Sequence, residues 1–511
     1  MGLVTYKQLA EHNNSGSCWI AVGGTVYDVT QFIHTHPGGA KIILKEAGKD
    51  ATSAFEAVHS VELLPRFDET VKPVGTLDKS SERLDSNDSS TAEADAAALR
   101  RAGMPSLGSV LNSFDFEAIA RQTMKPEAWA YYSSGAEDEI TLRENHAAFH
   151  RIALKPRVLV NVSHIDTSTT FLKQTRVSLP VYITACALGK LGHPDGETVL
   201  TRAAGARNVV QMMPTLASCS LDDMLNARVD SQDTWFQLYV NADRNVTRDV
   251  VLKAEARGCK GLFVTVDAPQ LGRREKDMRL KYQEDISDII VKTGGDEEGE
   301  SSTSTGQKKV NRAMGAARAI SSFIDPSLSW KDIEWLQTVT RMPIVLKGVQ
   351  TGADAVQAAK LGLAGVVVSN HGGRQLDTCR SGIEILPEVV ADLKRAGLHG
   401  KMEIYVDGGF RRGSDVFKAI ALGATGVGIG RPSLYAMSTF GQEGVERLLD
   451  IFREELEMVM GLMGCTKISD ITEDMVDASH LSTRVSLVRD MLHQTVYEPL
   501  QPPQFNRSSK L

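Results

Sequence analysis

A histidine and an arginine stand three residues apart in the segment from Ser369 to Asp377, SNHGGRQLD. The segment follows residues 365–368, one glycine and three valines that predict a buried parallel strand. His371 can exchange a proton near neutral pH, and Arg374 can bind a carboxylate through two parallel hydrogen bonds. The pair therefore predicts chemistry on a hydroxy acid or a keto acid. The simpler alternative is a glycine-rich turn with an exposed basic residue.

Strand-length apolar runs recur through the larger part of the chain, and helical patterns such as residues 249–257 and 352–361 separate many of them. Eight strands that alternate with helices predict a (β/α)8 TIM barrel. A doubly wound open sheet is the alternative, and the lack of a GxGxxG pattern after the first strand counts against it. The runs are residues 181–184, 209–212, 235–239, 261–266, 343–347, 366–369, 403–407 and 426–430.

Polar residues gather just where these strands are predicted to end, which is the catalytic face of a barrel. Glycines and arginines after the last two strands suit a phosphate, and without a Walker lysine motif a cofactor phosphate is favoured over a nucleoside triphosphate. Each residue also has a plainer alternative: Lys347 as a surface residue, Tyr239 as a core residue, Asp267 as a helix N-cap. The set is Gln237, Tyr239, Thr265, Asp267, Arg274, Lys347, Ser369, His371, Arg374, Asp407, Gly408, Gly409, Arg411, Gly430 and Arg431.

Two histidines in the first 77 residues have a spacing that could bind haem. His36 opens an HPGG segment, and His59 follows 23 residues later. A haem iron with two axial histidines needs one imidazole on each face, and the glycines let the backbone approach the macrocycle closely. The alternative is a pair of ordinary surface histidines beside a turn.

Residues 3–77 resemble cytochrome b5-type haem domains. The resemblance is carried by residues 18–22, residues 27–29, the HPGG segment, residues 47–52 and His59. It implies haem b with His36 and His59 as axial ligands. Because both axial positions would then be filled, it also implies a haem that carries electrons and does no bond chemistry.

From about residue 110 to 495 the chain resembles the FMN-dependent 2-hydroxy-acid dehydrogenase and oxidase family. The resemblance rests on residues 129–136, 149–152, 264–269, 346–348, 369–377 and 407–409. With a haem domain ahead of the barrel, the chain resembles the cytochrome-linked L-lactate dehydrogenases of that family.

The resemblance implies a role for each position. His371 would be the base and Asp267 would stabilise its imidazolium; whether His371 takes the Cα proton or the hydroxyl proton stays open. Lys347 would stabilise the reduced flavin. For the substrate, the implied contacts are Arg374 and Tyr131 with the carboxylate, Tyr239 with the hydroxyl, and Arg274 as added positive charge. For FMN, they are Ala185, Cys186, Ala187, Gln237, Thr265, Lys347 and Ser369 along the flavin, Arg411, Gly430 and Arg431 at the phosphate, and Asp407, Gly408 and Gly409 as further cofactor contacts.

Two stretches depart from the pattern of that family. The residues after the first strand are usually Thr-Ala, whereas this chain has Ala185-Cys186-Ala187. After the second strand a serine is usual, whereas this chain has Pro214-Thr215-Leu216. Backbone groups can still serve the flavin at the first stretch, but a hydroxyl contact is lost at the second. We therefore expect the flavin potential and affinity to differ from the family norm.

The predicted organisation is multidomain. A small α+β haem-binding domain (1–77) is followed by a linker (78–109), the barrel (110–495) and a tail (496–511), and residues 293–309 have the composition of a long surface loop. The predicted function is oxidation of an L-2-hydroxy acid, most simply L-lactate, by FMN, with electrons passed to haem b and a protein acceptor such as cytochrome c. The alternative is an oxidase that reduces O2 to H2O2.

Composition narrows the partners and the compartment of this 511-residue chain. The net charge of −7 with scattered basic residues argues against nucleic acid, and no apolar run is long enough to span a bilayer. Six cysteines without CxxC spacing indicate free thiols. We expect no secretory or mitochondrial presequence, and the C-terminal Ser509-Lys510-Leu511 predicts a peroxisomal address, with the cytoplasm or the mitochondrial intermembrane space as alternatives. The family resemblance implies a homotetramer.

Overall fold

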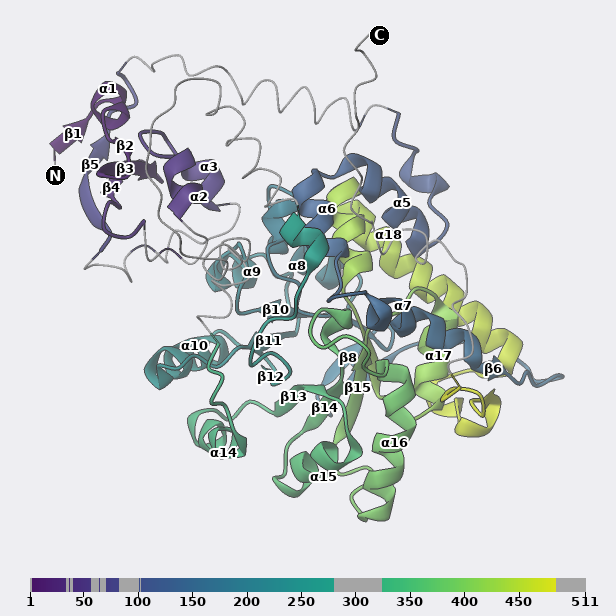
Figure 1. Cartoon of the computed structure of the whole chain (residues 1–511). Coiled ribbons are helices and arrows are strands. Elements are labelled where there is room, and N and C mark those ends of the chain that lie inside the picture. Colours follow the sequence, from purple (N-terminus) through teal and green to yellow (C-terminus); the bar gives the residue numbers. More distant parts are fainter. Residues whose placement is uncertain are drawn as a thin grey trace, which may run out of the picture.

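The structure, a computed structural model, describes residues 2–33, 36, 40–56, 64, 70–81, 101, 103–279 and 324–483. Figure 1 shows a small N-terminal group of elements and a larger group that contains the barrel. Several predicted features lie outside the described residues: His59, most of the linker, the 293–309 loop and the tail from 496 onward.

The N-terminal elements form a five-stranded sheet with the order β1-β5-β4-β3-β2. β1 and β5 pair in parallel, and the other pairs are antiparallel. Alternate residues of the third strand, Cys18, Ile20 and Val22, are buried on one face of the sheet, and Ala21 belongs to a second buried cluster on the other face. The elements are β1 (Gly2–Val4), α1 (Tyr6–Ala10), β2 (Asn13–Asn14), β3 (Ser17–Val22), β4 (Thr25–Asp28), α2 (Ala40–Lys45), α3 (Thr52–Glu56) and β5 (Lys72–Leu77).

Eight parallel strands close into a barrel, because the last strand pairs with the first. Each overlaps one of the eight predicted runs, so the predicted combination of an α+β domain and a (β/α)8 barrel is confirmed. The strands are β9 (Val181–Ile183), β10 (Val210–Pro214), β11 (Thr234–Leu238), β12 (Leu262–Thr265), β13 (Ile344–Val349), β14 (Gly365–Val368), β15 (Glu403–Asp407) and β16 (Gly426–Ile429).

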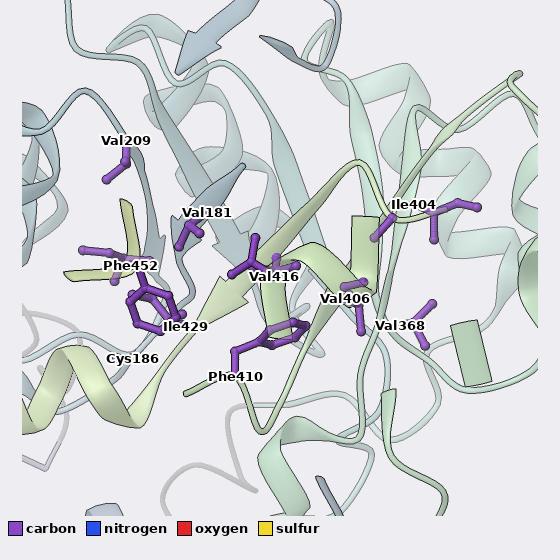
Figure 2. Packing of buried hydrophobic residues seen from close by; sticks show 14 of the residues in the cluster. Val181, Cys186, Val209, Val368, Ile404, Val406, Phe410, Val416, Ile429 and Phe452 are labelled. Atoms are coloured by element: carbon purple, nitrogen blue, oxygen red, sulfur yellow. The ribbon is translucent and has the colours of Figure 1, made fainter. Parts of the chain in front are cut away.

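Side chains of the barrel strands alternate between two buried clusters, which explains why the runs are apolar throughout. Val181 and Ile183 pack outward against the helices, whereas Tyr182 between them belongs to the cluster that fills the barrel. Figure 2 shows part of the outer cluster, including Val181, Val406 and Phe452. The barrel is therefore a packed core, and only its ends can hold a ligand.

Helices surround the barrel, and other elements cover its ends. A hairpin of β7 (Thr169–Phe171) and β8 (Thr175–Val177) places the Phe171 ring against Tyr182, Trp235 and Tyr405. An added Cβ at Gly426, the first residue of β16, would lie 2.5 Å from the Phe171 ring. The hairpin therefore closes the N-terminal end of the barrel and leaves the C-terminal end for chemistry.

The helices of the barrel carry their own start signals. Ser220, Ser329 and Ser381 stand at N-caps with an acidic residue three positions later. Within the described residues, no helix is both long enough and apolar enough to cross a bilayer. The helices are α5 (Ser113–Thr123), α6 (Pro126–Ser133), α7 (Ile140–Ala147), α8 (Glu197–Ala206), α9 (Leu221–Asn226), α10 (Arg244–Ala256), α14 (Trp330–Val339), α15 (Gly352–Lys360), α16 (Gly382–Arg395), α17 (Gly413–Ala421) and α18 (Arg431–Met463).

Candidate active site

A cavity of about 170 Å³ lies at the C-terminal ends of the barrel strands and joins most of the predicted site residues. The predicted substrate residues Tyr131, Tyr239, Arg274, His371 and Arg374 line it together with the glycines and arginines predicted for the phosphate. The lining also includes the predicted flavin residues Ala185, Cys186, Ala187, Gln237, Thr265, Lys347 and Asp407. Asp267 and Ser369 stand behind it, in hydrogen-bond contact with His371.

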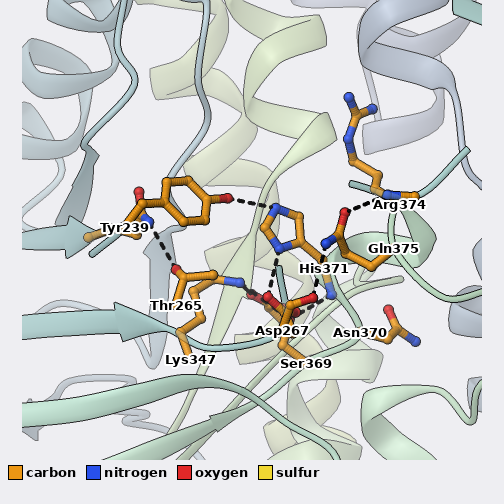
Figure 3. A network of polar contacts seen from close by, with 12 residues as sticks. Tyr239, Thr265, Asp267, Lys347, Ser369, Asn370, His371, Arg374 and Gln375 are labelled. Carbon is orange, nitrogen blue, oxygen red and sulfur yellow. Dashed lines mark hydrogen bonds and ion pairs between the residues drawn. The ribbon is translucent and has the colours of Figure 1, made fainter. Parts of the chain in front are cut away.

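His371 stands between a carboxylate and a phenol (Figure 3). Its Nδ1 lies 3.0 Å from Oδ1 of Asp267, and its Nε2 lies 3.3 Å from the hydroxyl of Tyr239. A carboxylate can only accept, so Nδ1 carries the proton and Nε2 has its lone pair on the Tyr239 side. His371 also has a φ of 58°, in the left-handed region that costs a non-glycine residue energy. The surrounding loop therefore holds this imidazole in one orientation.

The surroundings of His371 keep it neutral and its partner ionised. Burial lowers the pKa of His371 below its usual range, and the Asp267 charge opposes this without cancelling it. Burial would raise the pKa of Asp267, but the neighbouring His371 and Lys347 lower it. A neutral imidazole with a fixed tautomer beside a carboxylate is the arrangement a general base needs at neutral pH.

Asp267 is held in place by residues that the sequence did not single out for this role. Gln375 donates its side-chain amide to the carbonyls of Asp267 and Gln270, both at 3.0 Å. Gly348 has a φ of 108°, and an added Cβ there would lie 2.5 Å from the Asp267 side chain. Gln375 belongs to the same SNHGGRQLD segment as the base, so one loop supplies both the imidazole and the group that positions its partner.

Two arginine side chains, those of Arg274 and Arg374, line the cavity together with His371. Among the described residues, neither Arg274 nor Arg374 makes an ion pair with an acidic side chain. Burial, followed by the repulsion from Arg374, lowers the pKa of Arg274 to about 10. Arg374 donates to the carbonyls of Tyr131 and Ser134, and its guanidinium carbon lies 4.8 Å from the centre of the Tyr131 ring. Two guanidinium groups without an ion pair, that of Arg274 buried and that of Arg374 partly exposed, fit a carboxylate ligand.

Lys347 forms a second polar cluster under the cavity. Its Nζ lies 3.0 Å from Oδ2 of Asp407 and 3.3 Å from Oγ of Ser369, whose hydroxyl donates to Asp407 at 2.5 Å. Burial would lower the pKa of Lys347, but Asp407 and Asp267 raise it above the usual value, so the ammonium stays charged. Ser369 also accepts from the backbone N–H of His371, which links this cluster to the base.

The loop after β15 and the start of α18 present backbone amides to the cavity. Gly408 and Gly409 have φ angles of 94° and 86°, and an added Cβ at Gly409 would lie 1.9 Å from the carbonyl oxygen of Asn145. The α18 helix begins at Arg431 with Gly430 as its N-cap. Glycine amides beside a helix N-terminus form an anion site, so these residues fit a cofactor phosphate.

The arginines of this region have structural partners as well. Arg411 is buried and pairs with Glu117 at 2.7 Å. Arg431 donates to three carbonyl oxygens, those of Tyr132, Gly372 and Ser134, at 2.8 to 2.9 Å. The Arg431 side chain therefore ties loops together with three of its five N–H donors, which leaves two side-chain donors and its backbone N–H for a phosphate. Neither Glu117 nor these carbonyls carried a sequence signal.

The two departures from the usual pattern have different surroundings. Cys186 lines the cavity, and burial raises the pKa of its thiol to about 12, so the group is neutral. Thr215 uses its hydroxyl between strands: it donates to the carbonyl of Gln237 at 2.5 Å and accepts from the backbone N–H of Tyr239. The loss of a hydroxyl contact to the flavin at the second stretch stays a prediction.

Comparisons with known proteins agree with this geometry. Residues 120–478 match the family model described as FMN-dependent dehydrogenase. The chain belongs to the FMN-dependent dehydrogenase family. Residues 5–78 match the model of the cytochrome b5-like heme/steroid binding domain. This member of the family thus carries a b5-like domain ahead of its barrel, and its cofactors are FMN and haem.

Named relatives cover both the whole chain and the barrel alone. An L-lactate dehydrogenase (cytochrome) of Wickerhamomyces anomalus is 47% identical over 507 residues, which is 98% of this chain and 85% of that protein. Glycolate oxidase 1 of Oryza sativa subsp. indica is 42% identical over 378 residues, 74% of this chain and 98% of that protein. The solved flavin-binding domain of baker's yeast flavocytochrome b2 is 46% identical with a TM-score of 0.69, covering 81% of this chain and 98% of that one.

Of the two predicted haem ligands, only His36 lies within the described residues. Its backbone N–H donates to the carbonyl of Phe32 at 2.9 Å, and the two rings meet edge to face at 5.6 Å. His36 therefore lies just after a turn formed by residues 29–33, and hydrogen bonds anchor this turn to the N-terminal sheet. The pairing of His36 with His59 on one iron stays a prediction.

Proposed function

We propose that this chain oxidises an L-2-hydroxy acid, with L-lactate as the preferred substrate, to the 2-keto acid. One observation supports the proposal most: a neutral His371, fixed by Asp267, stands beside the unpaired guanidinium groups of Arg274 and Arg374 in a cavity that also reaches the phosphate-type glycine loop. The name of the relative from Wickerhamomyces anomalus, an L-lactate dehydrogenase (cytochrome), supports the choice of substrate.

Different side chains bind different groups of the substrate and accept its proton. Arg374 and Arg274 hold the carboxylate with Tyr131, and Tyr239 hydrogen-bonds the hydroxyl. Oxidation of the alcohol carbon removes two electrons and two protons, and His371 accepts one of those protons at Nε2. Asp267 stabilises the imidazolium that results, as a buried carboxylate does for a histidine base.

FMN, when bound, supplies the two-electron acceptor. Lys347 would provide a fixed positive charge against it, and the backbone amides of Gly408, Gly409 and Gly430 would hold its phosphate. Gln237 and Thr265, joined by a 2.9 Å hydrogen bond, would line the flavin side of the cavity. The thiol of Cys186 would stand there where the family usually has a hydroxyl.

We further propose that electrons leave through haem b, held by His36 and His59, to a protein acceptor such as cytochrome c. Reduction of O2 to H2O2 is the second candidate. Ser509-Lys510-Leu511 favours it, because a peroxisomal address suits a peroxide producer. We also propose a homotetramer and a peroxisomal location; sedimentation of the holoenzyme and imaging of a fluorescent fusion with and without the last three residues test these two points.

Rapid mixing of the purified holoenzyme with L-lactate tests the proposed route. The expected result is bleaching of the flavin absorbance, followed by reduced-haem absorbance and by reduction of added cytochrome c, with little uptake of O2. Oxygen uptake that matches lactate consumption while the haem stays oxidised would establish the oxidase instead. No flavin bleaching with any L-2-hydroxy acid would refute the proposed activity.

A further inference from the structure

Two loops on one side of the cavity each contribute an apolar wall residue. Ala187 follows β9 and Leu216 follows β10, and both line the cavity that Tyr239 and Arg274 also line. In the proposed function, the space between these two side chains is where the carbon chain of the hydroxy acid lies. What fixes the separation of the two loops therefore influences which chain length fits.

A fully buried carboxylate joins the two loops from behind. Glu197 has no exposed surface, and its Oε1 accepts from the backbone N–H of Gly189 at 2.7 Å and of Ser218 at 3.0 Å. Its Oε2 accepts from the Ser218 hydroxyl at 2.9 Å and from the N–H of Cys219 at 3.1 Å. Gly189 is two residues after Ala187, and Ser218 is two residues after Leu216, so one side chain is bonded to both loops at matching positions.

This carboxylate is held by hydrogen bonds and not by a cation. Among the described residues, no lysine or arginine lies within ion-pair distance of Glu197. Burial of a charge is costly unless donors replace its water, and here donors from both loops do so. Glu197 also occupies the first position of α8, where the helix N-terminus favours negative charge. Glu197 and its hydrogen bonds therefore form a fixed connection, here called the joint, between the two loops.

Further contacts keep the loops in register. The N–H of Lys190 donates to the Ser218 hydroxyl at 2.9 Å, and the Tyr132 hydroxyl donates to the carbonyl of Leu188 at 2.6 Å from the other side. Gly189 packs tightly against Glu197, since an added Cβ at Gly189 would lie 2.9 Å from the Glu197 carboxyl carbon.

We propose that Glu197 is a positioning residue for substrate specificity: by bonding both loops it sets the spacing of Ala187 and Leu216, and with it the chain length of the 2-hydroxy acid that is accepted. The inference rests on the proposed function. Glu197 does not reach the cavity itself, so it acts only through the two loops.

Replacement of Glu197 by glutamine tests this role. The amide nitrogen of the glutamine cannot accept a hydrogen bond and would face a backbone N–H donor, that of Cys219 or of Gly189, so the joint is weakened and the loops separate. We expect kcat/KM for L-lactate relative to L-2-hydroxyhexanoate to fall about fivefold or more, because a pocket discriminates small length differences by its fit. The FMN content should stay that of the parent, since no predicted flavin phosphate residue contacts Glu197.

Two further variants make the result decisive. Ser218→Ala removes one donor and should move the same ratio in the same direction by a smaller factor; it decides the question if Glu197→Gln does not fold. Asp354→Asn is the matched control, because Asp354 is an exposed carboxylate in the first turn of α15, away from the cavity. It should leave the ratio unchanged. A ratio in folded Glu197→Gln and in Ser218→Ala within about 1.5-fold of the parent, or an equal shift in Asp354→Asn, would overturn the inference.

A binding measurement separates this inference from the proposed activity. Dissociation constants of 2-keto acids with three to six carbons, measured by calorimetry on the holoenzyme, need no turnover. If the parent enzyme binds these keto acids but oxidises no 2-hydroxy acid, the proposed activity is refuted. The change in chain-length preference of binding between the parent and Glu197→Gln would still decide the role of Glu197.

Discussion

At the scale of single residues, the chemistry depends on His371 and the two groups that contact its ring nitrogens. Nδ1 faces Asp267 at 3.0 Å and Nε2 faces Tyr239 at 3.3 Å. Because burial lowers the pKa of His371, the ring is neutral at neutral pH and its Nε2 is free to accept a proton.

His371→Gln should therefore lower the rate of flavin reduction strongly while FMN stays bound. Removal of a general base costs roughly 10²–10⁴-fold, and the cost is larger where the base works as a unit with its partner. Rapid mixing with L-lactate gives the rate, and the flavin absorbance of the purified variant gives its FMN content. A rate within tenfold of the parent would contradict the role of His371.

The pH dependence of kcat/KM should depend on His371 and Asp267. The free enzyme needs neutral His371, so kcat/KM should be flat near neutral pH and fall as the pH drops through the lowered pKa of His371. Asp267 raises that pKa, so Asp267→Asn should move the acid limb to still lower pH and reduce the plateau by roughly 10²-fold. A pH profile measured on both enzymes checks this, and an acid limb that moves upward in the variant would exclude it.

Substrate size should follow from Leu216 and Ala187. A leucine opposite an alanine leaves space for a methyl group, and filling it gains about 0.8 kcal/mol per CH₂. We expect L-lactate to exceed glycolate by a few-fold to about tenfold in kcat/KM, and D-lactate to be inactive because Arg374 and Tyr239 select one face. Steady-state kinetics with the three acids decide the point, and a preference for glycolate would show that Leu216 does not shape the pocket.

At the scale of elements, α7 connects the loop of the base with the loop of the phosphate site. Asp377 accepts from the backbone N–H groups of Ile140 and Thr141 at the start of the helix. Near its end, the side-chain amide of Asn145 exchanges two hydrogen bonds with Asn370, at 2.7 and 2.9 Å. The carbonyl of Asn145 lies against Gly409, so the helix contacts both loops.

Asn145→Ala should show what this connection contributes. The buried Asn370 amide would lose partners, which costs about 1–3 kcal/mol of unfolding free energy. Because Asn370 precedes His371, we also expect a rate of flavin reduction per bound FMN that is roughly tenfold lower. Urea unfolding and rapid mixing measure the two effects, with the exposed Asn245→Ala as a control. Parent-like values for both would mean that α7 does not align the base.

At the scale of the whole molecule, the haem and flavin chemistry belong to separate folding units. The b5-like match ends at residue 78 and the dehydrogenase match begins at residue 120. Each unit has its own buried core in the structure. Electron transfer from one cofactor to the other is therefore a step between units, and it can be lost without loss of substrate oxidation.

His59→Ala should remove the haem absorbance and leave reduction of the flavin by L-lactate intact. Without the sixth ligand the b-type spectrum is lost, whereas the barrel and its cavity contain none of residues 1–77. Absorbance spectra before and after addition of substrate distinguish the two signals, and reduction of cytochrome c should stop. A folded variant whose flavin no longer reacts would show that the units depend on each other.

The sequence by itself determined the strands, the barrel and the residues that meet the substrate. The periodicity of apolar residues indicates which segments are buried strands. The C-terminal ends of barrel strands meet on one face. The sequence therefore predicts that His371, Arg374, Asp267, Tyr239 and Lys347 lie together in one site. Local patterns of this kind depend on residues that are neighbours in the chain, so a single sequence is enough to predict them.

Only the tertiary structure decided how those residues are held. Glu197 bonds to Ser218, Asn145 bonds to Asn370 and Glu117 pairs with Arg411, and no motif marks Glu197, Asn145 or Glu117. Residues 225 or more positions apart in the chain, as in the asparagine pair, become neighbours only when the barrel closes. The physical reason is that a buried polar group must find its partner in three dimensions, and the sequence records the group but not where its partner will lie.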